Sequence, residues 1–211
     1  MREADLLDTL VQSADRWLRT VAGRHVAERQ SPGEVVADAP LDDRERRHAA
    51  GLMRVNHTGE VCAQALYEGQ ALTARDSVVR ETLRQAAQEE EDHLAWCRAR
   101  LDELESAPSV LNPLWYGLSF AMGAVTGLLG DRVSLGFVAA TEEQVCKHLE
   151  HHLDALPEQD ERSRAVIVQM HADERRHGTH AMEAGGAAFP APVKELMTLV
   201  SRVMTESSYR V

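Results

Sequence analysis

The sequence is poor in aromatic residues, which make up 4% of its 211 residues, whereas hydrophobic residues as a whole make up 44%. A hydrophobic core must therefore be built mainly from alanine, leucine, valine and methionine. Proline is also scarce: only seven prolines interrupt long stretches of alanine, leucine, glutamate and arginine, which are strong helix formers. A chain of this length supports one domain with a full core and additional segments. The composition favours helices over sheet.

Cysteine is equally scarce. The three cysteines, Cys62, Cys97 and Cys146, are far apart and form no C-x-x-C motif. This spacing argues against a structural zinc site and favours free thiols in a reducing compartment. The first ten residues, MREADLLDTL, contain neither the apolar core of a signal peptide nor an arginine-rich transit pattern. A bacterial cytoplasmic setting is the simplest interpretation.

Positive charge is outnumbered, with 23 lysines and arginines against 34 aspartates and glutamates and a formal net charge of −11. This balance argues against a nucleic-acid partner and against purely electrostatic attachment to anionic lipid. The sequence also lacks a G-x-G-x-x-G motif, so any electrons from a nicotinamide cofactor must arrive without a built-in Rossmann domain.

Two short motifs of the same form stand out from this background. Glu90 and His93 make one Glu-x-x-His motif, and Glu174 and His177 make another. On a helix this spacing places a carboxylate and an imidazole one turn apart on the same face. One such motif arises easily by chance on a charged helix, but two of them are informative.

Each motif has a partner glutamate on the preceding predicted helix, Glu60 for the first and Glu142 for the second. Residues favouring turns lie midway in each case, at 73–77 and 157–160. Antiparallel hairpins would therefore bring the glutamates level in an all-α, ferritin-like four-helix bundle that holds two iron or two manganese ions. The predicted metal ligands are Glu60, Glu90, His93, Glu142, Glu174 and His177.

The apolar periodicity defines the rest of the chain. It predicts bundle helices over residues 42–74, 77–105 and 131–156 and from residue 160 onward. An amphipathic helix over 5–21 and a polar tether precede them, so that residues 1–41 form an arm and residues 42–211 form the catalytic domain. A last amphipathic segment follows Pro192, and it either covers the bundle, forms a dimer contact or joins a membrane-facing surface.

The phase of the second bundle helix distinguishes among three consecutive glutamates. Only Glu90 continues the apolar stripe, while Glu91 is turned toward solvent. A buried carboxylate is strongly unfavourable without a cation or partner, and Glu142 has the same position within its own stripe. Glu89 and Asp173 flank the metal face, where each either accepts a hydrogen bond from the histidine of the opposite motif or is simply solvated.

Residues 107–130 contain no charged side chain. The segment is long enough for a membrane span, but Pro108, a second proline and four glycines argue against one. A ferritin-like bundle needs a long crossover at this place. With Trp115, Tyr116 and Phe120, an apolar crossover suits either the bilayer interface or a channel to the metals, and the alternative is an ordinary buried helix.

Four stretches resemble the bacterial branch of the demethoxyubiquinone hydroxylases, the 2-polyprenyl-3-methyl-6-methoxy-1,4-benzoquinol monooxygenases of ubiquinone biosynthesis. They are GLMRVNHTGEVCAQALYEGQALTAR, EEEDHLAWCRARL, NPLWYGLSFAMGAVTGLLGDRVSLGFVAATEEQVCKHLEHHL and DERRHGTHA. The resemblance covers nearly the whole chain. It implies a di-iron centre, peripheral attachment to the cytoplasmic side of the cell membrane, and insertion of one oxygen atom from dioxygen into the polyprenyl benzoquinol ring. The chain could also form a homo-oligomer or join a biosynthetic complex.

The resemblance also implies how the ligands divide. Glu60, Glu90 and His93 would serve one iron, and Glu142, Glu174 and His177 the other, with Glu90 or Glu142 shared. Related enzymes carry a histidine followed by tyrosine near the quinone, whereas here His148 is followed by Leu149. His148 is therefore either a substrate contact or a histidine of the helix surface.

Two other classes of protein remain as alternatives. A ferritin- or rubrerythrin-like protein that oxidises iron or handles peroxide would share the ligands but has no use for an uncharged crossover. A metal-free membrane scaffold would explain the crossover but would leave the buried glutamates uncompensated.

Overall fold

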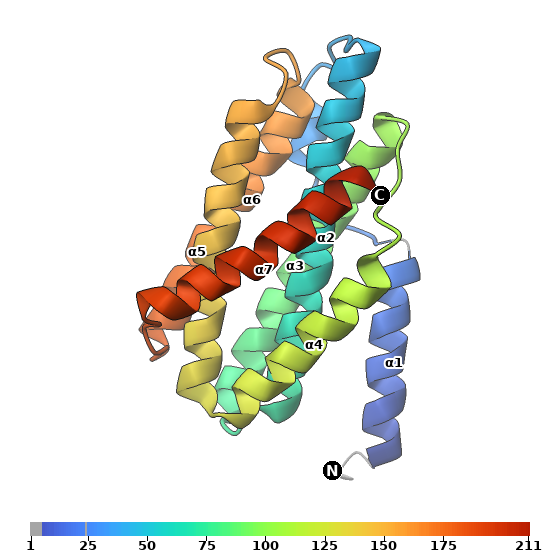
Figure 1. Cartoon of the computed structure of the whole chain (residues 1–211). Helices are drawn as coiled ribbons and strands as arrows, with labels where there is room; N and C mark the ends of the chain where they lie inside the picture. The colour runs from blue at the N-terminus through green and yellow to red at the C-terminus, as the bar shows by residue number, and fades with distance from the viewer. Residues whose placement is uncertain (1–5, 24) are drawn as a thin grey trace.

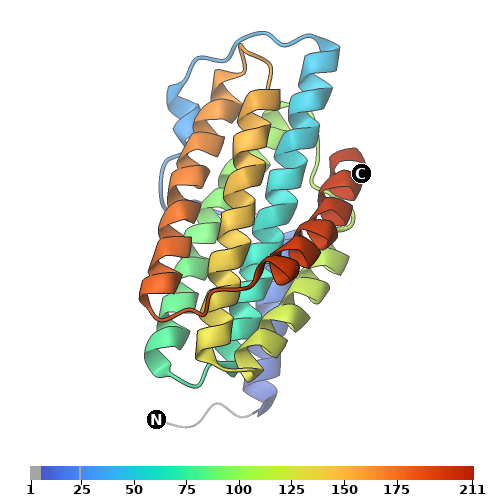
Figure 2. The same ribbon diagram turned by 60° about the vertical axis from the view of Figure 1, so that its left-hand side comes forward.

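The computed structural model describes residues 6–23 and 25–211, and within these ranges it contains helices and no strand. Four long helices run side by side: α2 (Asp43–Thr73), α3 (Ser77–Glu103), α5 (Asp131–Ala155) and α6 (Glu161–Glu183). Helices α2 and α3 form one antiparallel hairpin and α5 and α6 form the other, as Figure 2 shows from the side. The two hairpins meet through α3 against α6 and α2 against α5. The predicted all-α, ferritin-like bundle is confirmed.

Side-chain caps fix where the bundle helices begin. The Asp42 side chain accepts hydrogen bonds from backbone N–H groups in the first turn of α2, and the Glu45 side chain accepts one from the backbone N–H of Asp42. Asp76 accepts from the backbone N–H of Val78 at the start of α3, and Asp160 accepts from the backbone N–H of Ser163 at the start of α6. Such caps stabilise a helix by about 1 kcal/mol each. Both hairpin turns therefore fall where the sequence predicts them.

The bundle interior has two apolar layers with a polar layer between them. One apolar layer includes Met53, Cys97, Leu101, Leu149, Ile167 and Met170. The other includes Ala63, Tyr67, Leu83, Leu135, Val138 and Ala181. Along every bundle helix, the predicted metal ligands come between residues of these two layers. The apolar layers therefore hold the helices together on both sides of the polar residues.

The crossover between the hairpins contains α4 (Asn112–Leu128), which packs closely against α2. A side chain added at Gly69 would lie 2.2 Å from the carbonyl oxygen of Phe120, and one at Gly123 would lie 2.2 Å from that of Leu66. Glycine is required at both positions because the two backbones touch. Among the described residues, none of the helices combines the length and the apolar character needed to cross a bilayer.

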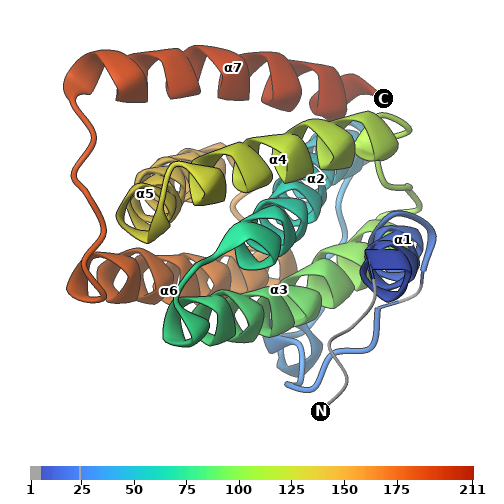
Figure 3. The same ribbon diagram turned by 90° about the horizontal axis from the view of Figure 1, so that it is seen from below.

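Two further helices lie outside the bundle. Helix α1 (Leu6–Ala22) lies beside α2 and α4, and α7 (Ala191–Arg210) crosses the bundle obliquely on the same side as α4, as the view from below makes clear (Figure 3).

The segment predicted as a tether instead packs on the bundle. It contains a short 3-10 helix, η1 (Pro32–Val35), which lies against α6. Ser31 and Gly33 are buried there, and Arg29 reaches acidic residues of both α3 and α6. Composition and the breaks at glycine and proline predict irregular structure correctly, but they do not reveal these contacts.

Candidate metal centre

The polar layer of the bundle receives side chains from all four helices. The six predicted ligands are Glu60 on α2, Glu90 and His93 on α3, Glu142 on α5, and Glu174 and His177 on α6. All six are buried, and the most exposed of them, His177, is only 7% accessible. The sequence periodicity therefore places these residues inside the bundle, as predicted for a metal centre.

The ring of His93 lies among three of the glutamates. Its Nδ1 is 2.9 Å from Glu90 Oε2, 3.1 Å from Glu174 Oε1 and 3.4 Å from Glu60 Oε2. One ligand atom from each of these four residues lies within 4.8 Å of the others. The group could hold a metal ion.

His177 faces two of the same glutamates from the other side. Its Nδ1 is 3.1 Å from Glu90 Oε1 and 3.4 Å from Glu174 Oε2. Glu90 and Glu174 therefore lie between the two imidazoles. The predicted division had Glu90 or Glu142 as the shared carboxylate, and here Glu90 lies between the imidazoles together with Glu174.

Glu142 occupies the edge of the group beside Tyr67. The Tyr67 hydroxyl donates a hydrogen bond to Glu142 Oε1, and both side chains are buried. Tyr67 lies seven residues after Glu60 and therefore on the same face of α2, but sequence reasoning assigned it no role. The hydrogen bond crosses from α2 to α5, so only the packed structure reveals it.

A carboxylate supports each imidazole from behind. His93 Nε2 is 3.1 Å from Asp173 Oδ2, and His177 Nε2 is 3.0 Å from Glu89 Oε2. Because a carboxylate only accepts, each Nε2 donates a proton to it, and each Nδ1 is directed at the glutamates. Both hydrogen bonds connect opposite motifs, which is the arrangement predicted for Asp173 and Glu89.

The four carboxylates of the group give it an excess of negative charge, and this changes the pKa values of its members. Burial raises the pKa of Glu60 and Glu142, and the neighbouring carboxylates raise these pKa values further. Burial lowers the pKa of His177, but Glu174 and Glu90 outweigh it and raise that pKa to about 12. Without a cation, the group therefore retains protons that a metal ion would replace.

The unpartnered atoms provide a test of whether metal ions fit. Among the described residues, the following buried atoms of the group make no hydrogen bond of good geometry, although His177 Nδ1 lies 3.1 Å from Glu90 Oε1 and 3.4 Å from Glu174 Oε2: Glu60 Oε2, Glu90 Oε1, Glu142 Oε2, both carboxylate oxygens of Glu174, and His177 Nδ1. Buried polar atoms are rarely left in this state. Two divalent cations would bind these atoms and balance the charge of four carboxylates. Oxygen donors with one imidazole per ion suit iron or manganese.

Two arginines that sequence reasoning missed bind the carboxylates behind the histidines. Arg29 Nη1 is 2.8 Å from Asp173 Oδ2, and Arg176 Nη1 is 2.8 Å from Asp173 Oδ1. Arg176 Nη2 also lies 2.5 Å from Glu89 Oε2. The position of Arg176, three residues after Asp173 on the same helix, is the only signal in the sequence for these contacts.

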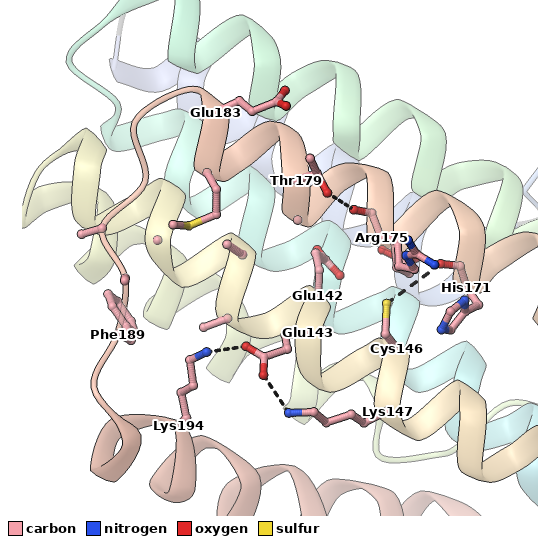
Figure 4. A pocket seen from close by; sticks show the side chains of 18 of the residues that line it. Glu142, Glu143, Cys146, Lys147, His171, Arg175, Thr179, Glu183, Phe189 and Lys194 are labelled. Atoms are coloured by element: carbon pink, nitrogen blue, oxygen red, sulfur yellow. Dashed lines mark hydrogen bonds and ion pairs between the residues drawn. The ribbon is translucent and has the colours of Figure 1, made fainter.

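A pocket of about 770 Å³ reaches the group from the opposite direction. It lies between α5, α6 and the segment that leads into α7, and Glu142 is on its wall (Figure 4). Glu174 also lines it. Small residues of α5 and α6 line it, together with Met182 and Phe189. Lys147 and Lys194 bind Glu143 near α7. The sequence suggested a channel through the crossover and did not predict this pocket.

The predicted substrate residue His148 lies on α5 facing α7, where its Nε2 is 2.9 Å from Ser201 Oγ. It is not among the residues that line the pocket. Two other histidines, His57 and His152, lie between α2, α4 and α5 and bind the side chains of Asn112 and Asn56. A role for His148 with the substrate stays a prediction.

Comparison with known proteins shows which family this chain resembles. The sequence model described as ubiquinone biosynthesis protein COQ7 matches residues 47–208. A 3-demethoxyubiquinol 3-hydroxylase of Ectopseudomonas mendocina is 59% identical over 211 residues, which cover 100% of this chain and 98% of the relative. The protein of the same name from Azotobacter vinelandii is 59% identical over 213 residues, with 100% and 98% coverage. That from Ralstonia pickettii is 57% identical over 217 residues, with 98% and 100% coverage.

Proposed function

Because the chain belongs to the family of the ubiquinone biosynthesis protein COQ7, we propose that it is a monooxygenase that hydroxylates the ring of a demethoxyubiquinol. The observation that carries this function is the buried group of four glutamates and two histidines in a chain that matches named hydroxylases along nearly its whole length. Those relatives favour a hydroxylase over a ferritin- or rubrerythrin-like protein. The catalytic domain comprises residues 42–211.

The proposed cofactor is a pair of iron ions. Glu60 and His93 would hold one ion, Glu142 and His177 would hold the other, and Glu90 and Glu174 would contribute to both. This division is supported by the distances from each Nδ1 to the two central glutamates. When bound, two iron ions together supply the two electrons that reduce dioxygen, which a single ion does less readily.

The side chains of this protein orient the ligands and control access. Asp173 and Glu89 hold the histidine rings with Nδ1 directed inward, and Tyr67 fixes the carboxylate of Glu142. The two apolar layers exclude water from both ends of the group. The substrate must therefore approach between helices rather than along the bundle axis.

The pocket between α5 and α6 is the proposed approach for the quinol ring. Its volume lies within the range of small-molecule sites, and its wall includes Glu142 and Glu174. Replacing Met182 by tryptophan should fill part of the pocket, because Met182 lines it and is 43% exposed. We expect a raised KM for the quinol with unchanged iron content. Val168→Trp, at an exposed position elsewhere on α6, is the matched control.

Peripheral binding to the cytoplasmic side of a bacterial membrane is the proposed location. Four outward side chains of α4, Leu114, Leu118, Met122 and Val125, are each about half exposed, at 49–55%. A second outward stripe on α7 contains Val193, Leu196, Val200 and Val203. Both helices lie on one side of the bundle (Figures 1 and 3). A polyprenyl substrate resides in the bilayer, and these faces would dock there through apolar contact.

Binding to lipid vesicles tests this location. The protein should stay bound in concentrated salt, because apolar contact is not screened and the net charge is −11. Leu118→Glu should release it, while Val168→Glu, on an exposed face of α6, should not. Complete release by salt alone would contradict this location. Gel filtration in detergent tests the predicted homo-oligomer.

The reaction itself is tested by assaying purified protein with a demethoxyubiquinol and a chemical reductant. Hydroxylated product should require both dioxygen and iron. Chelating iron during expression should give folded helical protein without activity, since the apolar layers do not depend on metal. Oxidation of added iron without hydroxylated product would favour the ferritin-like alternative.

A further inference from the structure

On the side of α3 and α6, away from the pocket, five charged side chains form a continuous chain. In order of contact they are Asp92, Arg29, Asp173, Arg176 and Glu89. Acid and base alternate along this chain, and every neighbouring pair is in hydrogen-bond contact, at 2.5–2.8 Å. The two histidines of the proposed metal centre bind two of its acids.

We propose that Arg176 is a positioning residue shared by both histidines, and that Arg29 is a second positioning residue which acts on His93 alone. This proposal rests on the proposed metal centre. Arg176 contacts Asp173, which binds His93, and also Glu89, which binds His177. The guanidinium group of Arg176 therefore joins the supports of the two imidazoles.

The hydrogen bonds of Asp173 show why two arginines are needed to hold its carboxylate in place. Its Oδ2 accepts from His93 and Arg29, and its Oδ1 accepts from Arg176 and from Gln169 at 3.2 Å. The side chain is completely buried. A buried carboxylate needs donors for both oxygens. The four donors together fix the carboxylate of Asp173 in the orientation that binds His93 Nε2.

Glu89 has fewer hydrogen-bond donors than Asp173, and its orientation therefore depends more on Arg176. Its side chain is 42% exposed, and a single oxygen, Oε2, binds both His177 and Arg176. Without Arg176, this carboxylate could turn into solvent and leave the His177 Nε2 without its acceptor. Loss of Arg176 should therefore disturb His177 at least as strongly as His93.

Arg29 reaches the chain from the segment that precedes the bundle, and several contacts hold it there. Its guanidinium carbon lies 4.8 Å from the centre of the Trp96 ring, and Trp96 Nε1 donates to the Arg29 carbonyl oxygen. The backbone N–H groups of Glu28 and Arg29 both donate to Asp92 Oδ1. The N-terminal segment is thereby fixed against the back of the metal centre.

Arginine chemistry is required because the contacts are forked. A guanidinium presents several donors in one plane, so Arg176 can bind two carboxylates at once in fixed directions. A lysine in its place would keep the positive charge, but its ammonium group would not bind both carboxylates in fixed directions. Arg84 is the matched control, because it is an exposed arginine on α3 whose ion-pair partner is the exposed Glu81 and it lies outside the pocket.

The test measures iron binding and the Mössbauer spectrum of the iron-loaded protein, neither of which depends on turnover. Arg176→Gln should lower the affinity for iron by about 10–100-fold and change the signals of both iron ions. Arg176→Lys should not restore them. Arg29→Gln should change mainly one of the two signals, and Arg84→Gln should match the wild type.

Helical content and melting temperature of the metal-free variants identify any that fail to fold. If Arg176→Gln does not fold, Arg29→Gln decides, because its partly exposed side chain can be replaced without opening the core. Wild-type iron affinity and spectra in folded Arg176→Gln or Arg29→Gln would overturn the proposal. Wild-type protein that binds no iron would instead contradict the metal centre itself.

Discussion

Two pairs of buried histidines occupy neighbouring parts of the bundle and have opposite surroundings. His93 and His177 lie between α3 and α6 with carboxylates at both ring nitrogens. His57 and His152 lie near α2, α4 and α5 with side-chain amides as partners. Members of both pairs are at most 7% accessible, so burial does not distinguish them.

The charge of the partners decides how each pair behaves. Burial lowers the pKa of a histidine, and together with smaller contributions from nearby basic groups it brings that of His57 to about 3 and that of His152 to about 4. At His177, the carboxylates of Glu174 and Glu90 reverse this effect and raise the pKa to about 12. Only the first pair therefore lies in a field that attracts a cation. The second pair is a neutral part of the interior.

The largest effect on the first pair is expected when the charge of Glu90 is removed. Glu90 is completely buried and contacts both His93 and His177. Glu90→Gln should abolish binding of both iron ions, since an amide cannot supply negative charge to offset them. Iron stoichiometry and the hydroxylation rate measure the effect.

The adjacent glutamate provides the control for Glu90. Glu91 is half-buried at the surface, and Gln88 is 3.4 Å from its carboxylate. Glu91→Gln should leave iron binding within error of the wild type, because surface substitutions are usually near neutral. Equal losses in the two variants would mean that the metal centre is misplaced on α3.

A smaller effect is expected when the support of one histidine is weakened while the ligands remain. Glu89→Gln keeps a side chain of the same size behind His177 but removes the charge that binds Nε2 and Arg176. Iron affinity or activity should fall by about 10–100-fold, between the values for Glu90→Gln and Glu91→Gln. A loss as complete as that of Glu90→Gln would show that Glu89 is itself a ligand.

The sequence predicts the helices and the burial of the six residues of the candidate metal centre because both depend on local periodicity. The apolar stripes and turn residues set the phase of each helix, and that phase carries Glu90 inward and Glu91 outward. The predicted ends of α2 and α5 differ from the observed ends by one residue at most. The two repeated motifs then identify the group of residues that the four helices bring together.

Contacts between distant segments could not be predicted in the same way. Arg29 lies in a polar stretch whose composition resembles that of any linker, and its role depends on how that stretch folds over α3 and α6. The central position of Glu174, rather than Glu142, depends on side-chain rotamers at a four-helix contact. The pocket likewise depends on where the segment after α6 lies.

The smallest predicted effect concerns the neutral pair and appears as pH dependence of stability. His152 has a pKa of about 4 in the folded protein and about 6.5 when unfolded, so below about pH 6.5 the unfolded chain binds a proton that the folded protein excludes. Stability should therefore fall with falling pH in this range. From about pH 7.5 to about pH 5, His152 should contribute about 2 kcal/mol of the loss in the free energy of unfolding.

Metal-free protein isolates this contribution, because ligand histidines released from iron would otherwise titrate as well. His152→Gln keeps a donor for Asn56 Oδ1 and removes the titrating ring. Urea unfolding at the two pH values should show a smaller acid loss in His152→Gln than in the wild type, whatever the difference at neutral pH. An identical loss in the two proteins would mean that His152 is protonated in the folded state. The contrast between the two histidine pairs would then fail, because a buried histidine with an amide partner would carry charge as well.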